Sequence, residues 1–556
     1  MLAEFGSTPS GGDAGSWLAD AFKDIGTTYP QIRAAVLFHT ENDKNWATEW
    51  RPDPTRAGID WSVLHDAGAR GKVAEGFARL QKASGHDGRI RIAAPVHREE
   101  KTTSSPKPYF TGAPGSYEML VDGKPFYIKG VAFNPGHDWR DGSKVLSRRE
   151  LDKDFSAIKA MGANTIRRYS GGWEDYNIFN AAEKAGLKVI YGLWLPHDID
   201  YARDLAQLDE FEKGFDELIT NIKDEPSLLV WVIGNETWGG LKHTCEQPYL
   251  TEVRWAYVRF VERLARRIRA ADPNRPIMVA CEHTEELAGA LSDYTRLAPT
   301  VDILGINSFY KEHLGYLQKT VAEFGNGKPY VVTEFGPDGY WHSDYSPRSP
   351  GGLLLEPSAR GKAEMIADRW TTLIQPNRGY NLGGVAYCWS DRYEGSSSWF
   401  GIVARDGTRK PSFAALQHAW TGKGIADPPG PKIDRLVVSN QVVGPGEIIT
   451  VEAAVSPDEE KRPIRLDWKV LEGNYDEASV EFGFPTAGRN KVNIVMPREE
   501  GRYWIHLNAS NESGNMDEIA AQIQVMGKTS AENEVVDLPA ASDNSVRQLT
   551  GLPRIH

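Results

Sequence analysis

The chain has 556 residues, and a single hydrophobic core stops growing at roughly 250 to 300 residues, so two or three domains are expected. Its 40% hydrophobic and 25% charged residues are typical of a folded globular protein and exclude a disordered or fibrous one. The net charge of -12 comes from acids dispersed along the chain, which argues against a nucleic-acid partner.

Neither the cysteines nor the apolar runs point to a particular compartment. Cys245, Cys281 and Cys388 are widely spaced and odd in number, so they predict neither a disulfide framework nor a metal-binding pattern. There is no run of about 18 apolar residues to span a bilayer, and the first residues lack the pattern of a secretory leader. We expect a soluble chain whose compartment is undecided: cytoplasmic, or periplasmic or extracellular if a leader precedes it.

Residues 1–106 are expected to form an α/β segment followed by a linker. A helical pattern over 14–27 precedes an apolar, strand-like run over 32–38, and a second helix is indicated over 73–83. The polar, proline-containing stretch over 84–115 has the composition of a linker. We therefore place a domain boundary at residue 106.

Residues 107–426 alternate short apolar runs with amphipathic helical stretches, which indicates β/α units and a parallel sheet. Eight strands are predicted, over residues 127–133, 163–167, 188–194, 228–234, 277–281, 303–306, 330–333 and 384–389. Eight such units in about 300 residues fit an α/β fold of the (β/α)8 TIM-barrel type, in which functional side chains gather at the carboxyl ends of the strands.

Residues 427–527 follow a proline-rich break and change to strand-length runs separated by turn residues. This pattern predicts an immunoglobulin-like β-sandwich, followed by a polar tail over 528–556. Tyr503 and Trp504 are adjacent in one strand and point to opposite faces, so they do not form a joint sugar-binding platform. A spacer or barrel-packing role is expected for this region rather than carbohydrate binding.

Two predicted strands each deliver one glutamate to the mouth of the barrel. Glu236 follows the fourth strand and is preceded by Asn235, and Glu334 lies at the end of the seventh strand. Retaining cleavage of a glycoside requires one carboxylic acid that protonates the leaving oxygen and one carboxylate that attacks the anomeric carbon. Opposite walls of one barrel supply this arrangement, so Glu236 and Glu334 are the predicted catalytic residues. Asn235 is expected to bind the sugar 2-hydroxyl.

The barrel resembles the catalytic domain of glycoside hydrolase family 2, with families 5 and 72 as relatives. The residues that carry the resemblance are the strand-one stretch 121–131, the strand-two stretch 162–167, the two glutamate motifs and the exit over 399–411. The resemblance implies that Glu236 is the acid/base and Glu334 the nucleophile. It also implies that Arg167 holds the nucleophile ionised.

The residues before the barrel match neither of the domains that usually precede it in family 2. Instead, Glu4 and the run 32–38 resemble the last two strand–helix units of a family 26-like barrel. On this interpretation Glu4 occupies a nucleophile position that has no acid/base partner. We therefore expect the segment to be catalytically silent.

Aromatic residues near strand ends are expected to contact the sugar. The related families place a tyrosine hydroxyl on the nucleophile, and Tyr310 is assigned that role through a one-residue shift; the alternative is that the contact is lost. Trp389 is expected to form the platform under the sugar, because pyranose faces stack on indole, with a core position as the alternative. Trp238 is expected to supply an apolar wall that keeps Glu236 protonated. The other substrate-binding candidates, which follow strand ends, are Trp194, His283 and Asn134.

These residues predict a retaining β-glycosidase that acts on an oligo- or polysaccharide, with β-glucan favoured because aromatic side chains suit extended chains. The alternatives are a transglycosylase that uses the same residues and a non-catalytic glycan-binding protein. No cofactor is expected, and the scattered histidines lack metal-ligating spacing. The sequence does not decide between exo and endo action, nor does it indicate the oligomeric state.

Overall fold

The computed structural model of the protein describes residues 2–5, 13–28, 35–37, 67–83, 108–133, 148–172, 174–342, 344–423, 428–472, 481–483, 489–527 and 536–539. The chain divides into two compact units, Met1–Ser104 and Ser105–His556.

In the first unit, two short strands alternate with two helices along the chain. β1 (Leu2–Phe5) pairs in parallel with β2 (Ala35–Leu37), α1 (Ala14–Thr27) lies between them in sequence, and α2 (Ala67–Ala83) follows. The two helices share a small cluster formed by Leu18, Phe22, Ala69 and Val73. This order agrees with the strand–helix alternation read from the sequence. The family 26-like origin of the segment and its catalytic silence stay predictions.

The second unit begins with an antiparallel sheet of three strands, β3 (Tyr109–Thr111), β4 (Glu118–Val121) and β5 (Lys124–Phe126). The turn between β4 and β5 is formed by Asp122 and Gly123, whose φ angles are 51° and 72°. A two-residue hairpin turn with both φ angles positive matches the twist of the strands, and an Asp-Gly pair is well suited to it.

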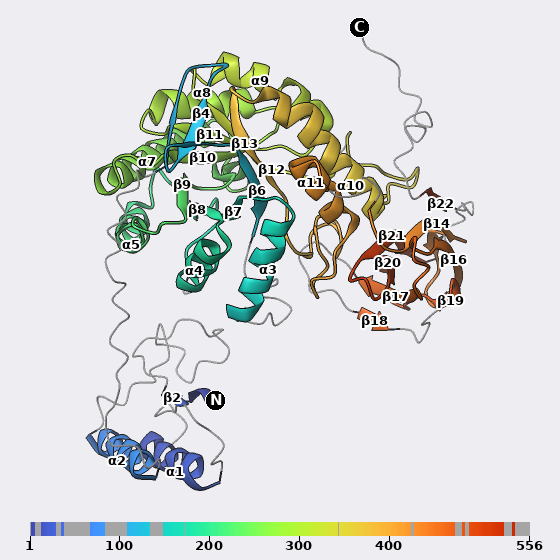
Figure 1. Ribbon diagram of the computed structural model, residues 1–556, viewed down its shortest axis with the longest axis horizontal. Coiled ribbons are helices and arrows are strands. Elements are labelled where there is room, and N and C mark those ends of the chain that lie inside the picture. The colour runs from blue at the N-terminus through green and yellow to red at the C-terminus, as the bar shows by residue number, and fades with distance from the viewer. Residues whose placement is uncertain are drawn as a thin grey trace. The chain divides into compact units, whose positions relative to one another are not determined.

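A closed barrel of eight parallel strands follows (Figure 1). The strands, in barrel order, are β6 (Ile128–Ala132), β7 (Thr165–Arg168), β8 (Lys188–Leu193), β9 (Leu228–Ile233), β10 (Ile277–Glu282), β11 (Ile303–Asn307), β12 (Tyr330–Phe335) and β13 (Asn381–Ala386). All eight predicted strands are present, which confirms the barrel. β13 ends at Ala386, so the residues from 387 to 389 that were predicted to complete it lie beyond the strand.

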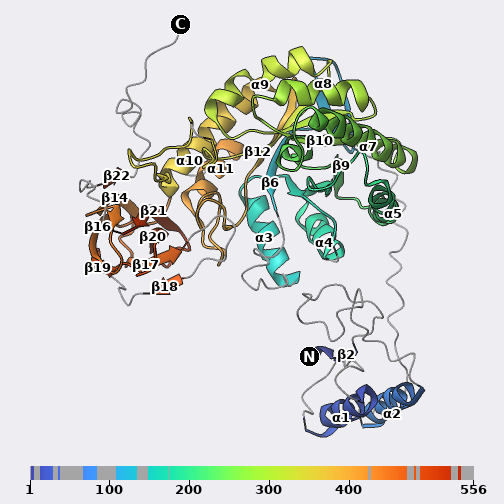
Figure 2. The same ribbon diagram turned by 180° about the vertical axis from the view of Figure 1, so that it is seen from behind.

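The helices surround these strands, as the view from behind makes clear (Figure 2). Their bounds are α3 (Arg148–Ala160), α4 (Asp175–Ala185), α5 (Leu205–Ile222), α6 (Thr237–Gly240), α7 (Tyr249–Ala271), α8 (Leu287–Leu297), α9 (Lys311–Phe324), α10 (Ala359–Asp368) and α11 (Pro411–Thr421). There are also two short 3₁₀ helices, η4 (Leu241–His243) and η6 (Gln375–Asn377), and a π-helix, η5 (Arg369–Ile374). Helices on the outside explain why every residue of β9 and β12 is buried, since strands covered on both faces become apolar throughout.

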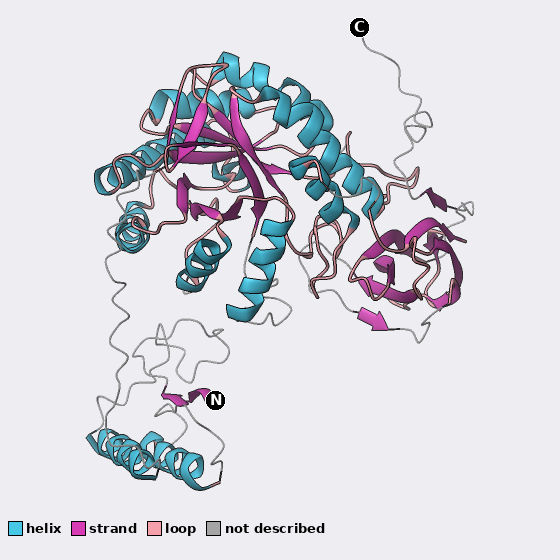
Figure 3. Cartoon of the chain, in the orientation of Figure 1, coloured by secondary structure: helices cyan, strands magenta, loops and turns pink. Residues whose placement is uncertain are grey.

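Two further sheets, separate from the barrel in Figure 3, complete the unit. One has the order β19 (Lys491–Val495), β16 (Ile448–Ser456), β14 (Lys432–Val438) and β22 (Val536–Pro539); the other has the order β15 (Val442–Val443), β21 (Met516–Val525), β20 (Gly501–Ser510), β17 (Arg465–Glu472) and β18 (Glu481–Gly483).

The two sheets pack on each other through one hydrophobic cluster to which both contribute. Tyr503 belongs to this cluster, whereas Trp504 packs on Trp399 of the barrel with the ring centroids 6.2 Å apart. The two aromatic side chains therefore point to opposite faces of β20, as the alternation along a strand requires. Trp504 joins the sheets to the barrel.

Candidate active site

Glu236 and Glu334 lie at the same end of the barrel because β9 and β12 run parallel to each other. Glu334 is the penultimate residue of β12, whereas Glu236 follows β9 and is the N-cap residue of the short helix α6. The backbone of Glu236 is left-handed, with φ 57°, which a non-glycine residue adopts only where its surroundings hold it. Here its amide donates to the carbonyl of Ala280 on β10 at 2.9 Å.

The carboxylate of Glu334 is held by a cation and a phenol. Nη1 of Arg167 donates to Oε1 of Glu334 at 2.8 Å, and the hydroxyl of Tyr169 donates to the same oxygen at 2.7 Å. The guanidinium also lies over the Tyr169 ring, 4.3 Å from its centroid. Glu334 is only 6% exposed, so these charge-assisted bonds are made where water competes little.

Arg167 connects the two carboxyl groups through two asparagines. Its side chain is 1% exposed, and its Nη2 donates to Oδ1 of Asn235 at 2.6 Å. Nη1 also donates to Oδ1 of Asn307 on β11 at 3.2 Å. The amide of Asn307 in turn donates to Oε1 of Glu236 at 2.8 Å. One hydrogen-bonded network therefore fixes both carboxyl groups relative to each other.

Burial governs the ionisation of both carboxyl groups. Burial first, and then the charges of Glu334 and Glu282, raise the pKa of Glu236 to about 8. Burial also raises the pKa of Glu334, while the charge of Arg167 and the hydrogen bond from Tyr169 act in the lowering direction. The predicted effect of Arg167 is present, but it does not bring the pKa of Glu334 below its ordinary value. Glu334, with the bonded cation, is the carboxyl group better able to carry a charge.

The tyrosine assignment is corrected by the structure. Tyr169, and not Tyr310, donates its hydroxyl to Glu334. Tyr310 precedes α9, and its hydroxyl instead lies 3.4 Å from Oγ of Ser346 and accepts from the amide of His342. The chain has already turned from β11 into the helix at Tyr310, which takes the phenol away from the mouth.

Two of the three tryptophans assigned to the site on sequence grounds, Trp389 and Trp238, have their indoles packed against the helices. Trp389 is buried, hydrogen-bonds to Asp154 of α3 and packs on Phe413 of α11, so it does not form the sugar platform. It lies beyond the end of β13, where strand alternation no longer sets its direction. Trp238 donates to Asp293 of α8 and lies beneath the guanidinium of an α7 arginine, rather than walling Glu236.

The structure places the other predicted substrate-binding residues, His283, Trp194 and Asn134, differently from one another. His283 is buried, with Nδ1 2.8 Å from Oγ of Ser308, and packs on His313; neither carboxyl group is among these contacts. Trp194 follows β8 and is 40% exposed, as a sugar-stacking residue would be. Asn134 lies outside the described residues.

Three site residues were missed or left unused by the sequence reasoning. Tyr169 follows Arg167 by two positions, so strand alternation was a signal that both face the same way. Asn307 was noted only as part of a motif, although it joins the two carboxyl groups. Tyr387 follows β13 with its ring 5.7 Å from Phe309 and 5.3 Å from Phe400. It had no local signal beyond its position near a strand end.

No helix in the described part of the chain combines the length and the apolar character that crossing a membrane requires. Nor does any group of three or more His, Cys, Asp or Glu side chains in these residues have an arrangement suited to a metal ion.

Residues 116–346 match the family model described as "Glycosyl hydrolases family 2, TIM barrel domain". Similar curated proteins include the β-glucuronidase of Canis lupus familiaris, 26% identical over 322 residues, which are 54% of this chain and 44% of that protein. The β-glucuronidase of Paenibacillus borealis is 25% identical over 241 residues, which are 40% of this chain and 37% of that protein. The chain thus spans less than half the length of these relatives.

Solved structures to which the chain is similar include a Bacteroides uniformis β-glucuronidase, with a TM-score of 0.46 and 17% identity over 76% of this chain and 48% of that chain. Another is a β-galacturonidase from Eisenbergiella tayi bound to galacturonate, with a TM-score of 0.43 and 18% identity over 57% of this chain and 55% of that chain.

Proposed function

Because the chain carries a glycoside hydrolase barrel of the family 2 type, we propose that the protein is a retaining β-glycosidase with Glu334 as nucleophile and Glu236 as acid/base. The observation that carries the proposal is the Arg167 network, which bonds to Glu334 and reaches Glu236 through Asn307. In this network Glu334 accepts a hydrogen bond from the Arg167 cation, whereas Glu236 accepts one from the neutral amide of Asn307.

In the first step, an oxygen of Glu334 attacks the anomeric carbon while Glu236 gives its proton to the leaving oxygen. The described bonds of Glu334 from Arg167 and Tyr169 both engage Oε1, which makes Oε2 the candidate attacking oxygen. The glycosidic C–O bond breaks and an ester to Glu334 forms. In the second step, a water gives a proton to Glu236 and attacks the anomeric carbon, and the ester bond breaks.

The exchange of roles at Glu236 has a physical basis in the site. The charge of Glu334 is one of the causes that raise the pKa of Glu236 to about 8, which favours the acid form in the free enzyme. Ester formation removes that charge, so the pKa of Glu236 falls and the group becomes the base that the second step needs.

We further propose a β-linked glycan, with β-glucan favoured, as the substrate. Two tryptophans that follow barrel strands are exposed, Trp194 by 40% and Trp341 by 49%. Exposed indoles near a catalytic mouth suit the apolar faces of successive pyranose rings, which an extended chain provides. The relatives named above are β-glucuronidases, so selectivity between neutral sugars and uronates needs its own test.

The experiment incubates the full chain with a reduced β-glucan oligosaccharide of defined length and follows product length and anomeric form. Net retention with shorter products is expected; products longer than the substrate would indicate transglycosylation. Glu236→Gln and Glu334→Gln should each lose at least 1,000-fold in turnover, roughly the loss of a covalent or acid/base catalyst, while still binding the oligosaccharide. Glu323→Gln, an exposed change on α9, is the matched control.

Azide separates the two roles. In Glu236→Ala, azide should attack the glycosyl-enzyme and give the β-glycosyl azide, whereas in Glu334→Ala it should attack from the opposite face and give the α-glycosyl azide. Unchanged rates in either glutamine variant, with binding retained, would reject the mechanism and favour a glycan-binding protein.

A further inference from the structure

We propose that Glu394 lines the donor subsite, where it accepts hydrogen bonds from hydroxyls of a neutral sugar and disfavours a uronate. The inference rests on the proposed function and names the substrate class and the residue that selects it.

Glu394 lies in the loop that follows β13, on the same edge of the barrel as the two carboxyl groups. The hydroxyl of Tyr387 lies 3.0 Å from Oε1 and 2.8 Å from Oε2 of Glu394. Both side chains are half-buried, so they are neither sealed in the core nor free in solvent. Tyr387 is held by the aromatic rings of Phe309 and Phe400 on its other sides.

This pair is close to the nucleophile. The backbone amide of Tyr387 donates to the carbonyl of Phe335, the residue after Glu334, at 2.9 Å, and burial together with the charge of Glu394 raises the pKa of the Tyr387 phenol well above its ordinary value. Tyr169 itself donates to Glu334. Tyr387 and its partner Glu394 therefore lie beside the strand end that carries the nucleophile, at the mouth where a bound sugar ring would lie.

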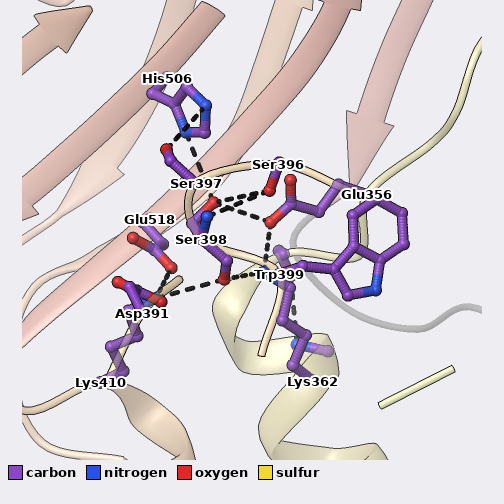
Figure 4. Close-up of polar contacts among 12 residues, drawn as sticks. Glu356, Lys362, Asp391, Ser396, Ser397, Ser398, Trp399, Lys410, His506 and Glu518 are labelled. Atoms are coloured by element: carbon purple, nitrogen blue, oxygen red, sulfur yellow. Dashed lines mark hydrogen bonds and ion pairs between the residues drawn. The ribbon is translucent and has the colours of Figure 1, made fainter. Parts of the chain in front are cut away.

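The loop that carries Glu394 is anchored on its N-terminal side by buried charges (Figure 4). Nζ of Lys410 donates to Oδ1 of Asp391 at 2.5 Å and also pairs with Glu518 of β21. All three side chains are more than nine-tenths buried. Such an ion pair contributes little net stability once desolvation is counted, but it fixes the geometry of the groups that it joins.

On the C-terminal side of Glu394, Ser398 provides a second anchor (Figure 4). Its hydroxyl donates to Glu356 at 2.8 Å, and its carbonyl accepts from Nζ of Lys362 at 2.9 Å. His506 of β20 lies 3.5 Å from the same hydroxyl. The C-terminal sheets thus hold the loop on both sides of Glu394, which is a more specific role than that of a spacer.

The charge of Glu394 gives the site its selectivity. Sugar hydroxyls are donors that a carboxylate accepts readily, whereas a uronate would bring another carboxylate beside Glu394 and Glu334. Removal of the charge of Glu394 would remove this repulsion, so the discrimination against a uronate should weaken.

The test uses the full chain with 2,4-dinitrophenyl β-glucoside and β-glucuronide and compares kcat/KM. The wild type should prefer the glucoside by at least about tenfold. Glu394→Gln should lower kcat/KM for the glucoside about tenfold and shift the glucoside-to-glucuronide ratio at least tenfold toward the glucuronide. The control Glu323→Gln should leave both values unchanged.

A second variant separates the effect of the negative charge of Glu394 from the effect of its side-chain length. Glu394→Asp keeps the charge and withdraws the oxygens, so it should raise the KM for the glucoside and keep the discrimination against the glucuronide. Wild-type constants in Glu394→Asp, or an unchanged ratio in a folded Glu394→Gln, would overturn the proposal. A wild type that cleaves neither aryl glycoside nor the oligosaccharide would instead reject the proposed function on which the inference rests.

Discussion

Arg167→Gln is the change that most directly tests the proposed roles of Glu334 as nucleophile and Glu236 as acid/base. The guanidinium donates to Glu334 at 2.8 Å and is almost completely buried, so water does not readily replace it. A hydrogen bond to a charged group contributes about 1.5–3 kcal/mol, which at about 1.4 kcal/mol per pKa unit corresponds to roughly 1–2 units. Loss of the cation removes a stabilising partner of the anion, so the pKa of Glu334 rises by that amount.

The assay is the pH profile of kcat/KM for an aryl β-glycoside. The acid limb, which reports ionisation of the nucleophile, should move up by about 1–2 pH units, and activity on that limb should fall roughly 10- to 100-fold. The alkaline limb should also move upward, because the charge of Arg167 lowers the pKa of Glu236. Arg167→Lys should recover part of the shift.

Arg259→Gln, an exposed change on α7, is the control for loss of a positive charge elsewhere. A folded Arg167→Gln with reduced activity but with both limbs at their wild-type positions would refute the electrostatic reasoning. It would leave Arg167 with only a role in orienting its neighbours.

Further predictions concern Glu236, Tyr169 and Glu518. Activity should fall as pH rises through about 8, the pKa to which burial raises Glu236. Because that value exceeds the ordinary 4.5, the contribution of this carboxyl group to stability is fully present below about pH 4.5 and is lost through about pH 8. Glu236→Gln should therefore match the wild-type Tm at pH 4 and exceed it at pH 9; equal Tm values at both pH values would contradict this. Tyr169→Phe should lower kcat/KM by about 10- to 100-fold, the value of a hydrogen bond to a charged group, whereas Tyr310→Phe should stay within about threefold of the wild type; the reverse order would restore the rejected tyrosine assignment. Glu518→Gln should lower stability by roughly 1–3 kcal/mol and raise KM several-fold as the loop after β13 loosens, against a Glu323→Gln control; an unchanged KM at a lowered Tm would limit the C-terminal sheets to packing.

The barrel could be predicted because its signals are local. Each strand is a short apolar run covered on both faces, and β9, with all its residues buried, shows why such runs lack alternation. The two glutamates could be found by the same reasoning, since a polar residue in the last positions of a buried strand, or shortly after it, lies at the carboxyl end of that strand. Arg167 was also found in this way, and its contact with Glu334 is present.

The wrong assignments all concern residues just past the end of a strand. Tyr310 is the N-cap residue of α9, and Trp389 lies beyond the end of β13. The alternation of side chains along a strand therefore did not determine where either side chain points. Trp238 lies in α6, and its indole contacts Arg254 of α7 and Asp293 of α8. A residue in a loop or a short helix points where its surroundings allow, and those surroundings come from distant parts of the chain.

The sequence by itself therefore determined the elements, their order and the kind of chemistry, because strand and helix periodicities and the positions of acids at strand ends are properties of neighbouring residues. Only the tertiary structure decided which side chains meet. Tyr169 reaches Glu334 across 165 positions of sequence, and Lys410 reaches Glu518 across 108. Such pairs depend on barrel closure and on packing of the C-terminal sheets, which no local pattern encodes.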